Sequence, residues 1–217
     1  MTSLTPDDLV RRLDARRLVP VVVIEEPQQA VPLAQALWRA GLDLIEVTFR
    51  TPAAAGAIRA IREALPDMVV GAGTLLAPAQ VDEALAAGAA FGVAPGFNPV
   101  VVAHAQAVGL PFIPGIATPT ELEAALAAGC RTLKFFPAEP AGGVPMLKGM
   151  AAAYGHTGVR FMPTGGVDAA RLGAWLAVPE VVAVGGTWFV DRARIRAGAW
   201  DEIEQCTREA LTRAGGR

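Results

Sequence analysis

The feature that most constrains the fold is the alternation of short β-branched runs with longer alanine-rich stretches, repeated eight times along 217 residues. Short apolar runs bounded by turn residues are typical of buried strands, and the stretches between them are typical of helices. We expect strands at 19–24, 42–48, 68–72, 90–93, 111–114, 132–136, 160–163 and 181–184. We expect helices at 28–40, 52–65, 78–87, 99–108, 120–128, 144–154, 168–176 and 196–214. This alternation predicts a parallel sheet covered by helices.

The turn residues favour a single domain built on one closed sheet. Gly41, Gly88, Gly109 and Gly129 each follow an expected helix, where a glycine cap is common. No glycine- or serine-rich linker divides the chain, so we expect one α/β domain over residues 1–217, a (β/α)8 TIM barrel with an N-terminal helix. The alternative is an open doubly wound sheet, which usually has a glycine-rich turn after its first strand. Residues 25–28 read Glu-Glu-Pro-Gln, which argues against that alternative.

Composition excludes several classes of protein. The chain is 53% hydrophobic and 18% charged, which suits a sheet buried on both faces. A net charge of −2 argues against nucleic acid or an anionic membrane as partner. Residues 1–20 lack the apolar core of a signal peptide, and no run approaches the ~18 apolar residues of a membrane span. We therefore expect a cytoplasmic protein whose two cysteines, Cys130 and Cys206, form no disulfide framework.

One lysine stands inside an apolar strand. Lys134 lies between Leu133 and Phe135, and a closed barrel offers no sheet edge at which it could reach solvent. Burial disfavours the ammonium form and so favours the neutral amine that attacks a carbonyl. Glu46, in the second expected strand, could then shuttle protons. The alternative is a purely structural salt bridge of Glu46 with Lys134 or Arg50.

Glycine pairs follow the last two expected strands. Gly165-Gly166 and Gly185-Gly186 let backbone N–H groups approach an anion, and a helix N-terminus should follow the first pair. The loops after strands seven and eight are the usual phosphate site of this fold. His104 and His156 have no neighbouring carboxylate pattern, so we expect no metal site.

These motifs, in order and across almost the whole chain, resemble the 2-keto-3-deoxy-6-phosphogluconate (KDPG) / 4-hydroxy-2-oxoglutarate (KHG) aldolase family. The matching segments are 45–51 (Ile-Glu-Val-Thr-Phe-Arg-Thr), 71–74 (Gly-Ala-Gly-Thr), 95–96 (Pro-Gly), 114–118 (Pro-Gly-Ile-Ala-Thr), 133–138 (Leu-Lys-Phe-Phe-Pro-Ala), 163–167 (Pro-Thr-Gly-Gly-Val) and 184–188 (Val-Gly-Gly-Thr-Trp). The resemblance implies a homotrimeric Schiff-base (class I) aldolase that cleaves KDPG to pyruvate and glyceraldehyde 3-phosphate, closing the Entner–Doudoroff pathway. It implies no cofactor beyond the lysine imine.

The resemblance also assigns roles. It makes Lys134 the Schiff-base lysine and Glu46 the general acid/base. Arg50, Thr74 and Pro95 would line the pyruvate end, with Arg50 and Thr74 near the carboxylate. Gly165, Gly166, Gly186 and Thr187 would hold the phosphate, and Phe136 and Thr164 complete the expected substrate-binding set.

Three positions depart from the family pattern. Thr187 stands where serine is common, and Phe49 and Ala94 where leucine and serine are frequent. Two alternatives stay open: a 2-keto-3-deoxy-6-phosphogalactonate aldolase, and a phosphate-binding barrel isomerase or synthase that forms no imine. The Thr48-x-Arg50 motif after Glu46 favours the gluconate enzyme.

Overall fold

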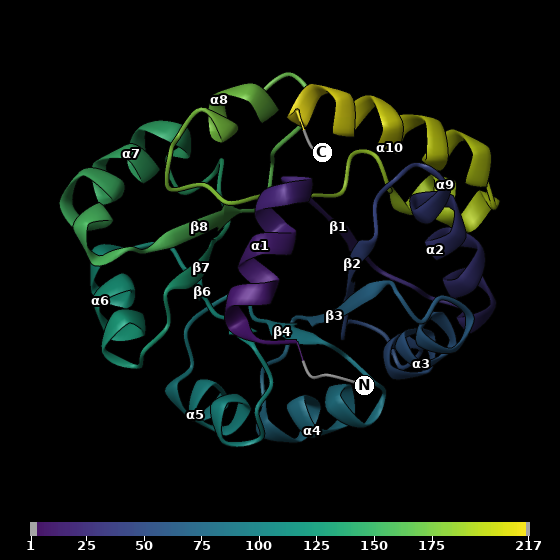
Figure 1. Cartoon of the computed structure of the whole chain (residues 1–217), viewed down its shortest axis with the longest axis horizontal. Helices are drawn as coiled ribbons and strands as arrows, with labels where there is room; N and C mark the ends of the chain where they lie inside the picture. The colour runs from purple at the N-terminus through teal and green to yellow at the C-terminus, as the bar shows by residue number, and fades with distance from the viewer. Residues whose placement is uncertain (1–3, 216–217) are drawn as a thin grey trace.

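The computed structural model describes residues 4–215 as a ring of helices around a central barrel of strands (Figure 1). The outermost residues of the expected domain, 1–3 and 216–217, lie outside the described part. The strands are β1 Leu18–Val22, β2 Leu44–Thr48, β3 Val69–Gly73, β4 Phe91–Val93, β5 Phe112–Ile113, β6 Gly115–Ile116, β7 Thr132–Phe135, β8 Arg160–Pro163 and β9 Val184–Gly186. The helices are α1 Pro6–Arg16, α2 Ala30–Arg39, α3 Ala54–Ala64, α4 Pro78–Ala86, α5 Pro99–Ala107, α6 Pro119–Ala127, α7 Gly143–Tyr154, α8 Leu172–Leu176, α9 Arg192–Ala197 and α10 Trp200–Ala214, with 3-10 turns at Pro27–Gln29 and Gly155–Thr157.

The strands close on themselves with every pairing parallel. Six are ordered β5-β4-β3-β2-β1-β9 and three β6-β7-β8. Single bridges, Phe161 to Val181 and Thr164 to Gly185, join β8 to the last strand. The fifth strand, expected at 111–114, is β5, and the chain continues beyond Pro114, which has no N–H to donate, as a further strand, β6. The prediction of a (β/α)8 barrel is confirmed.

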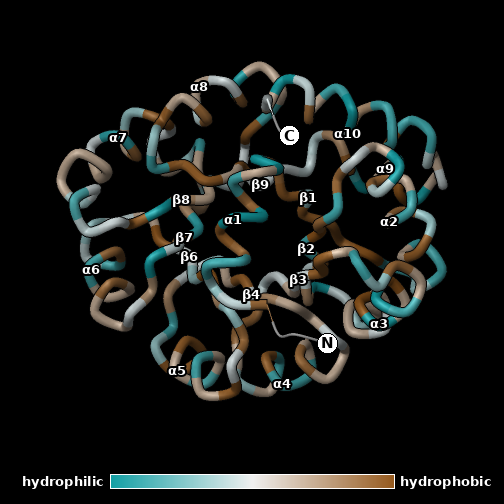
Figure 2. Tube along the Cα trace, in the orientation of Figure 1, coloured by the Kyte–Doolittle hydropathy of each residue, from teal (hydrophilic) through white to brown (hydrophobic). Residues whose placement is uncertain are grey.

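Glycine and proline set the helix boundaries much as expected. Gly41, Gly88, Gly109 and Gly129 all have positive φ, between 74° and 95°, a conformation that glycine adopts without steric cost. Hydrophobic residues are frequent along the strands and on the inner turns of the helices, whereas most hydrophilic residues lie on the outer turns (Figure 2). The buried residues of the strands and the helices form one continuous core.

Three expected elements were wrong in extent. The helix expected at 196–214 is two helices, because Gly198 (φ 66°) ends α9 and α10 begins after it. The helix expected at 168–176 is only α8, because Asp168 accepts from the N–H groups of Ala170 and Arg171 and forms a turn instead. The last strand lies at Val184–Gly186 rather than at 181–184.

Helix α1 covers the N-terminal end of the barrel and crosses the middle of the ring in Figure 1. Its Leu9 and Leu13 are buried, and its Arg12 and Arg16 bind Asp43, directly before β2. Burial by itself raises the pKa of Asp43. The Arg16 hydrogen bond and the two guanidinium charges outweigh that effect and hold the pKa below its usual value. With this end covered, substrate access is left to the C-terminal ends of the strands.

Candidate active site

Lys134 and Glu46 meet inside the barrel. Lys134 lies on β7 and Glu46 on β2, and these strands face each other across the barrel. The Lys134 Nζ donates to Glu46 Oε1 at 3.1 Å, and the residues are 4% and 0% exposed. The second oxygen, Oε2, is buried and has no hydrogen-bond partner among the described residues. A buried ion pair with an unused acceptor is costly for folding, so its presence suggests chemistry.

Gly73 makes room for this pair. A Cβ at position 73 would overlap Glu46 Oε1 and approach its Cδ to 2.8 Å. Glycine at the end of β3 therefore lets the Glu46 carboxylate lie against the strand backbone, within reach of Lys134.

A cavity of ≈ 140 Å³ opens above the pair at the C-terminal ends of the strands. It is lined by Val21, Thr48, Arg50, Thr74, Pro95, Lys134, Phe136, Thr164, Gly165, Gly166, Val167, Gly185, Gly186 and Thr187. All nine residues expected to bind substrate are in this set, and Glu46 lies behind Lys134. A larger cavity of ≈ 420 Å³ lies beside α1 at the opposite end, but it lacks a paired amine and carboxylate.

Four lining residues were not predicted: Val21, Thr48, Val167 and Gly185. Two had a usable signal, because strand alternation already put Thr48 on the side of Glu46, and Gly185 belongs to the second glycine pair. Val21 and Val167 read as ordinary core residues. Val21 lies within β1, and Val167 directly follows the first glycine pair.

The cavity runs from a buried floor to a polar rim. Lys134 forms the floor, with its Nζ 5.6 Å from the centre of the Phe136 ring. Arg50, Gly166 and Thr187 are exposed at the rim. Thr74 has φ 60°, an unusual value for a β-branched residue and one that marks functional sites. A substrate whose carbonyl meets Lys134 could thus extend a charged group to either side of the rim.

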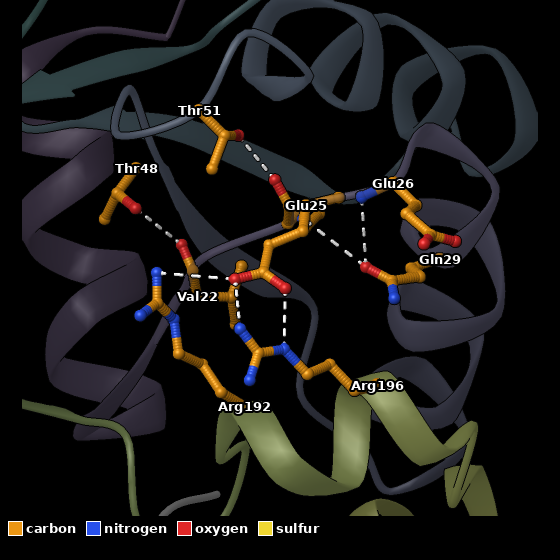
Figure 3. Close-up of polar contacts among 9 residues, drawn as sticks. Val22, Glu25, Glu26, Gln29, Thr48, Thr51, Arg192 and Arg196 are labelled. Carbon is orange, nitrogen blue, oxygen red and sulfur yellow. Dashed lines mark hydrogen bonds and ion pairs between the residues drawn. The ribbon is translucent and has the colours of Figure 1, made fainter.

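Polar contacts beneath the rim fix the ends of β1 and β2 (Figure 3). The Thr48 hydroxyl donates to the Val22 carbonyl at 2.9 Å. Glu25, just after β1, forms a two-point ion pair with Arg196 of α9, at 2.6 and 2.7 Å. The Arg196 hydrogen bond holds the pKa of Glu25 below its usual value. These contacts join the β1 and β2 loops to the helix that follows the second glycine pair.

The glycine loops differ from expectation in one respect. Gly165 and Gly166 have φ values of 102° and 79°, as a close-turning loop requires. The turn at residues 168–171 separates them from the five-residue α8, so no helix N-terminus follows directly. Anion binding here would rest on loop N–H groups.

Histidine and cysteine lie apart from this cavity. His104 pairs with Asp82 at 2.7 Å on the surface, and burial raises the pKa of the Cys130 thiol. Within residues 4–215, no group of three or more His, Cys, Asp or Glu could hold a metal ion.

Comparison with known proteins identifies one family. The model of the family "KDPG and KHG aldolase" matches residues 9–206. A 2-dehydro-3-deoxy-phosphogluconate aldolase of Treponema pallidum is 47% identical over 203 residues, which are 94% of this chain and 96% of the relative.

Two solved structures are also similar. KDPG aldolase of Legionella pneumophila, with pyruvate captured as a covalent carbinolamine, has a TM-score of 0.89 at 37% identity, covering 94% of this chain and 97% of that one. The 2-keto-3-deoxy-6-phosphogluconate aldolase of Zymomonas mobilis ZM4, with 3-phosphoglycerate, has a TM-score of 0.87 at 37% identity, covering 95% and 96%.

Proposed function

The chain belongs to the KDPG and KHG aldolase family, and on that premise we propose how its own residues perform the reaction. It is a Schiff-base aldolase that cleaves KDPG to pyruvate and glyceraldehyde 3-phosphate. We propose that it also cleaves KHG to pyruvate and glyoxylate. The observation that carries the assignment of roles is the buried Lys134–Glu46 pair at the floor of the cavity.

The first half of the reaction forms the imine. When Glu46 takes a proton from the Lys134 ammonium, the neutral amine attacks C2 of the keto acid and gives a carbinolamine. Glu46 then protonates the departing hydroxyl, which leaves as water, and the protonated imine remains. The 3.1 Å contact between Nζ and Oε1 is within direct proton-transfer reach.

The second half breaks the carbon–carbon bond. Glu46 accepts the proton of the C4 hydroxyl, the C3–C4 bond cleaves, and its electron pair moves toward the iminium nitrogen as an enamine. The aldehyde leaves, C3 takes a proton, and water hydrolyses the imine to release pyruvate and free Lys134. The protein's own amine supplies the electron sink, so we propose that turnover requires no cofactor or metal.

The rim residues support binding of two anionic ends. We propose that Arg50 and Thr74 hold the carboxylate, with Pro95 and Phe136 packing on the pyruvate portion. Thr164, Gly165, Gly166, Gly186 and Thr187 would hold the phosphate.

Steady-state cleavage assays test this function. Pyruvate release should be fast with KDPG, slower with KHG, and unchanged after dialysis against a metal chelator. Preferential cleavage of the phosphogalactonate diastereomer would favour that aldolase instead. If none of the three substrates, KDPG, KHG and the phosphogalactonate diastereomer, yields pyruvate, the alternative of a barrel enzyme that forms no imine would be favoured.

We propose further that the active form is a cytoplasmic homotrimer. Leu76 and Val100 are 56% and 63% exposed near the C-terminal ends of β3 and β4, as a subunit contact would require. No helix among the described residues is long and apolar enough to cross a membrane. Sedimentation equilibrium should give about three times the 22.5 kDa of the chain, and a monomer would contradict the trimer.

A further inference from the structure

The loop after β8 is held from its outer side by the segment that follows β7. The Ala138 N–H donates to the Thr164 carbonyl at 2.8 Å, and the Glu139 N–H donates to the Gly165 carbonyl at 3.0 Å. The carbonyl of a trans peptide and the N–H that follows it point in opposite directions. These two bonds therefore turn the N–H groups of the glycine pair away from residues 138–139.

The next peptide is held by a side chain instead. Arg171 Nη1 donates to the Gly166 carbonyl at 3.1 Å. By the same geometry, this contact turns the Val167 N–H to the opposite side. The Thr164–Gly185 bridge directs the Gly165 N–H toward the Gly185 carbonyl. Within residues 4–215, the N–H groups of Gly166 and Val167 donate no hydrogen bond, and both residues line the cavity. Successive free N–H groups of this kind form an anion site.

Arg171 is itself fixed by two carboxylates. Its Nη1 lies 3.0 Å from Asp168 Oδ2, and its Nε lies 3.8 Å from Glu139 Oε2. The other oxygen of Glu139 accepts from Nε1 of the fully buried Trp175 at 2.8 Å. The guanidinium is thereby held in place although its side chain is 54% exposed.

Glu139 also lies close to the loop. A Cβ at Gly166 would come within 2.8 Å of the Glu139 Cβ, so the backbones of the two segments are in contact. A carboxylate so near an anion site would weaken it, and the Arg171 guanidinium offsets that charge.

We propose that Arg171, held by Glu139, is a positioning residue that sets the affinity of this site for the substrate phosphate. It fixes the peptide between Gly166 and Val167, and touches neither the reacting carbons nor Lys134. The inference rests on the proposed function, because it assigns this loop to the phosphate of KDPG. It goes further by making phosphate discrimination depend on a side chain outside the cavity.

Steady-state kinetics of Arg171→Met with two substrates tests the inference. The KM for KDPG should rise about tenfold, the order expected when a charge-assisted hydrogen bond is lost. The KM for KHG, which has no phosphate, should change less than about twofold on the same scale. Arg171→Lys keeps the charge and a donor, so its KM for KDPG should lie between those of the parent and Arg171→Met. Equal KM changes for both substrates, or no change, would overturn the proposal.

Arg208→Met is the matched control. Arg208 is 56% exposed, pairs with Glu204 and donates to the backbone carbonyl of Arg39, all away from the site. Both KM values should stay at those of the parent. A rise for KDPG alone in this control would show that any lost surface arginine has the effect.

Binding of inorganic phosphate separates this inference from the proposed function. Calorimetric titration should give a Kd about tenfold weaker for Arg171→Met than for the parent. That comparison needs no turnover, so it stands even if the parent cleaves none of the sugar acids. Equal phosphate affinities would overturn the role of Arg171 while leaving the aldolase assignment intact.

Discussion

The chemistry proposed here depends on one carboxylate lying within reach of one amine. Glu46 is wholly buried, accepts one hydrogen bond from Lys134, and keeps a second oxygen unpaired in the described structure. A carboxylate placed only for stability would have both oxygens satisfied. The unpaired oxygen is available to the hydroxyl that loses its proton when the carbon–carbon bond breaks.

Replacing this carboxylate should separate proton transfer from imine formation. Glu46→Gln keeps the shape but cannot carry a proton, so kcat should fall about 10²–10³-fold, within the usual range for a general acid/base. Imine formation with pyruvate should survive at a reduced rate. Steady-state kinetics and borohydride trapping of the pyruvate adduct on the same preparation would measure both effects. A kcat of Glu46→Gln equal to that of the parent would contradict the proton-transfer role.

Gly73 gives a second test at the residue scale. The methyl group of Gly73→Ala would overlap the Glu46 carboxylate, so activity should fall sharply and the free energy of unfolding should drop by about 1–3 kcal/mol. Gly56→Ala is the control, because a Cβ there has nothing within 4 Å and lies in α3. It should keep full activity and unfold at equal or higher denaturant concentration. Parental activity in Gly73→Ala would show that Glu46 needs no such room.

At the scale of the element, local patterns were readable and long-range contacts were not. The strand positions and the four glycine-ended helices follow from periodicity and turn residues. Lys134 and Glu46 were predicted to meet because the barrel brings inward-facing residues together. The strand was predicted to end at Pro114 and its continuation as β6 was missed, since a proline can end a strand or divide one. The Glu139–Arg171 contact was missed because neither residue belongs to a pattern with a known meaning.

Helix α6 offers a pH-dependent test of its own capping. Glu121 accepts from the N–H groups of Ala117 and Thr118, at 2.8 and 2.9 Å. The Ala117 hydrogen bond, aided by Thr118, holds the pKa of Glu121 below its usual value. A lowered folded-state pKa adds stability above the unfolded pKa, and this stability is lost as the pH falls through the folded pKa.

Glu121→Gln should therefore unfold more easily than the parent at pH 7, by about 0.5–1 kcal/mol, a typical value for a cap. The difference should shrink as the pH falls below about 4, where the parent carboxylate also becomes neutral. Urea unfolding at both pH values measures it. A difference that stays constant with pH would contradict the capping account.

At the scale of the whole molecule, α1 determines which end of the barrel is open. The single carboxylate of Asp43 binds Arg12 and Arg16, so loss of its charge should weaken the seating of the helix. Asp43→Asn should lower the free energy of unfolding by about 1–2 kcal/mol, the scale of a charged hydrogen bond. Hydrogen exchange in residues 6–16 should also become faster. The turnover rate should stay near that of the parent, because the Lys134 cavity lies at the opposite end of the barrel. Unchanged hydrogen exchange in α1 would contradict the role of Asp43 in holding this helix.

We also propose that residues 1–217 unfold as one domain. One closed barrel with a continuous core predicts a single transition, coincident by far- and near-ultraviolet circular dichroism. Two separated transitions would contradict it.

The central claim is that Lys134 forms the covalent imine, and trapping with borohydride tests it most directly. The chain has only two lysines, Lys134 and the exposed Lys148 of α7, so the second serves as an internal control. After incubation with pyruvate and borohydride, mass spectrometry of the digested protein should show a reduced pyruvyl adduct on the Lys134 peptide and none on the Lys148 peptide. An unmodified Lys134 peptide, or an adduct confined to Lys148, would contradict the claim.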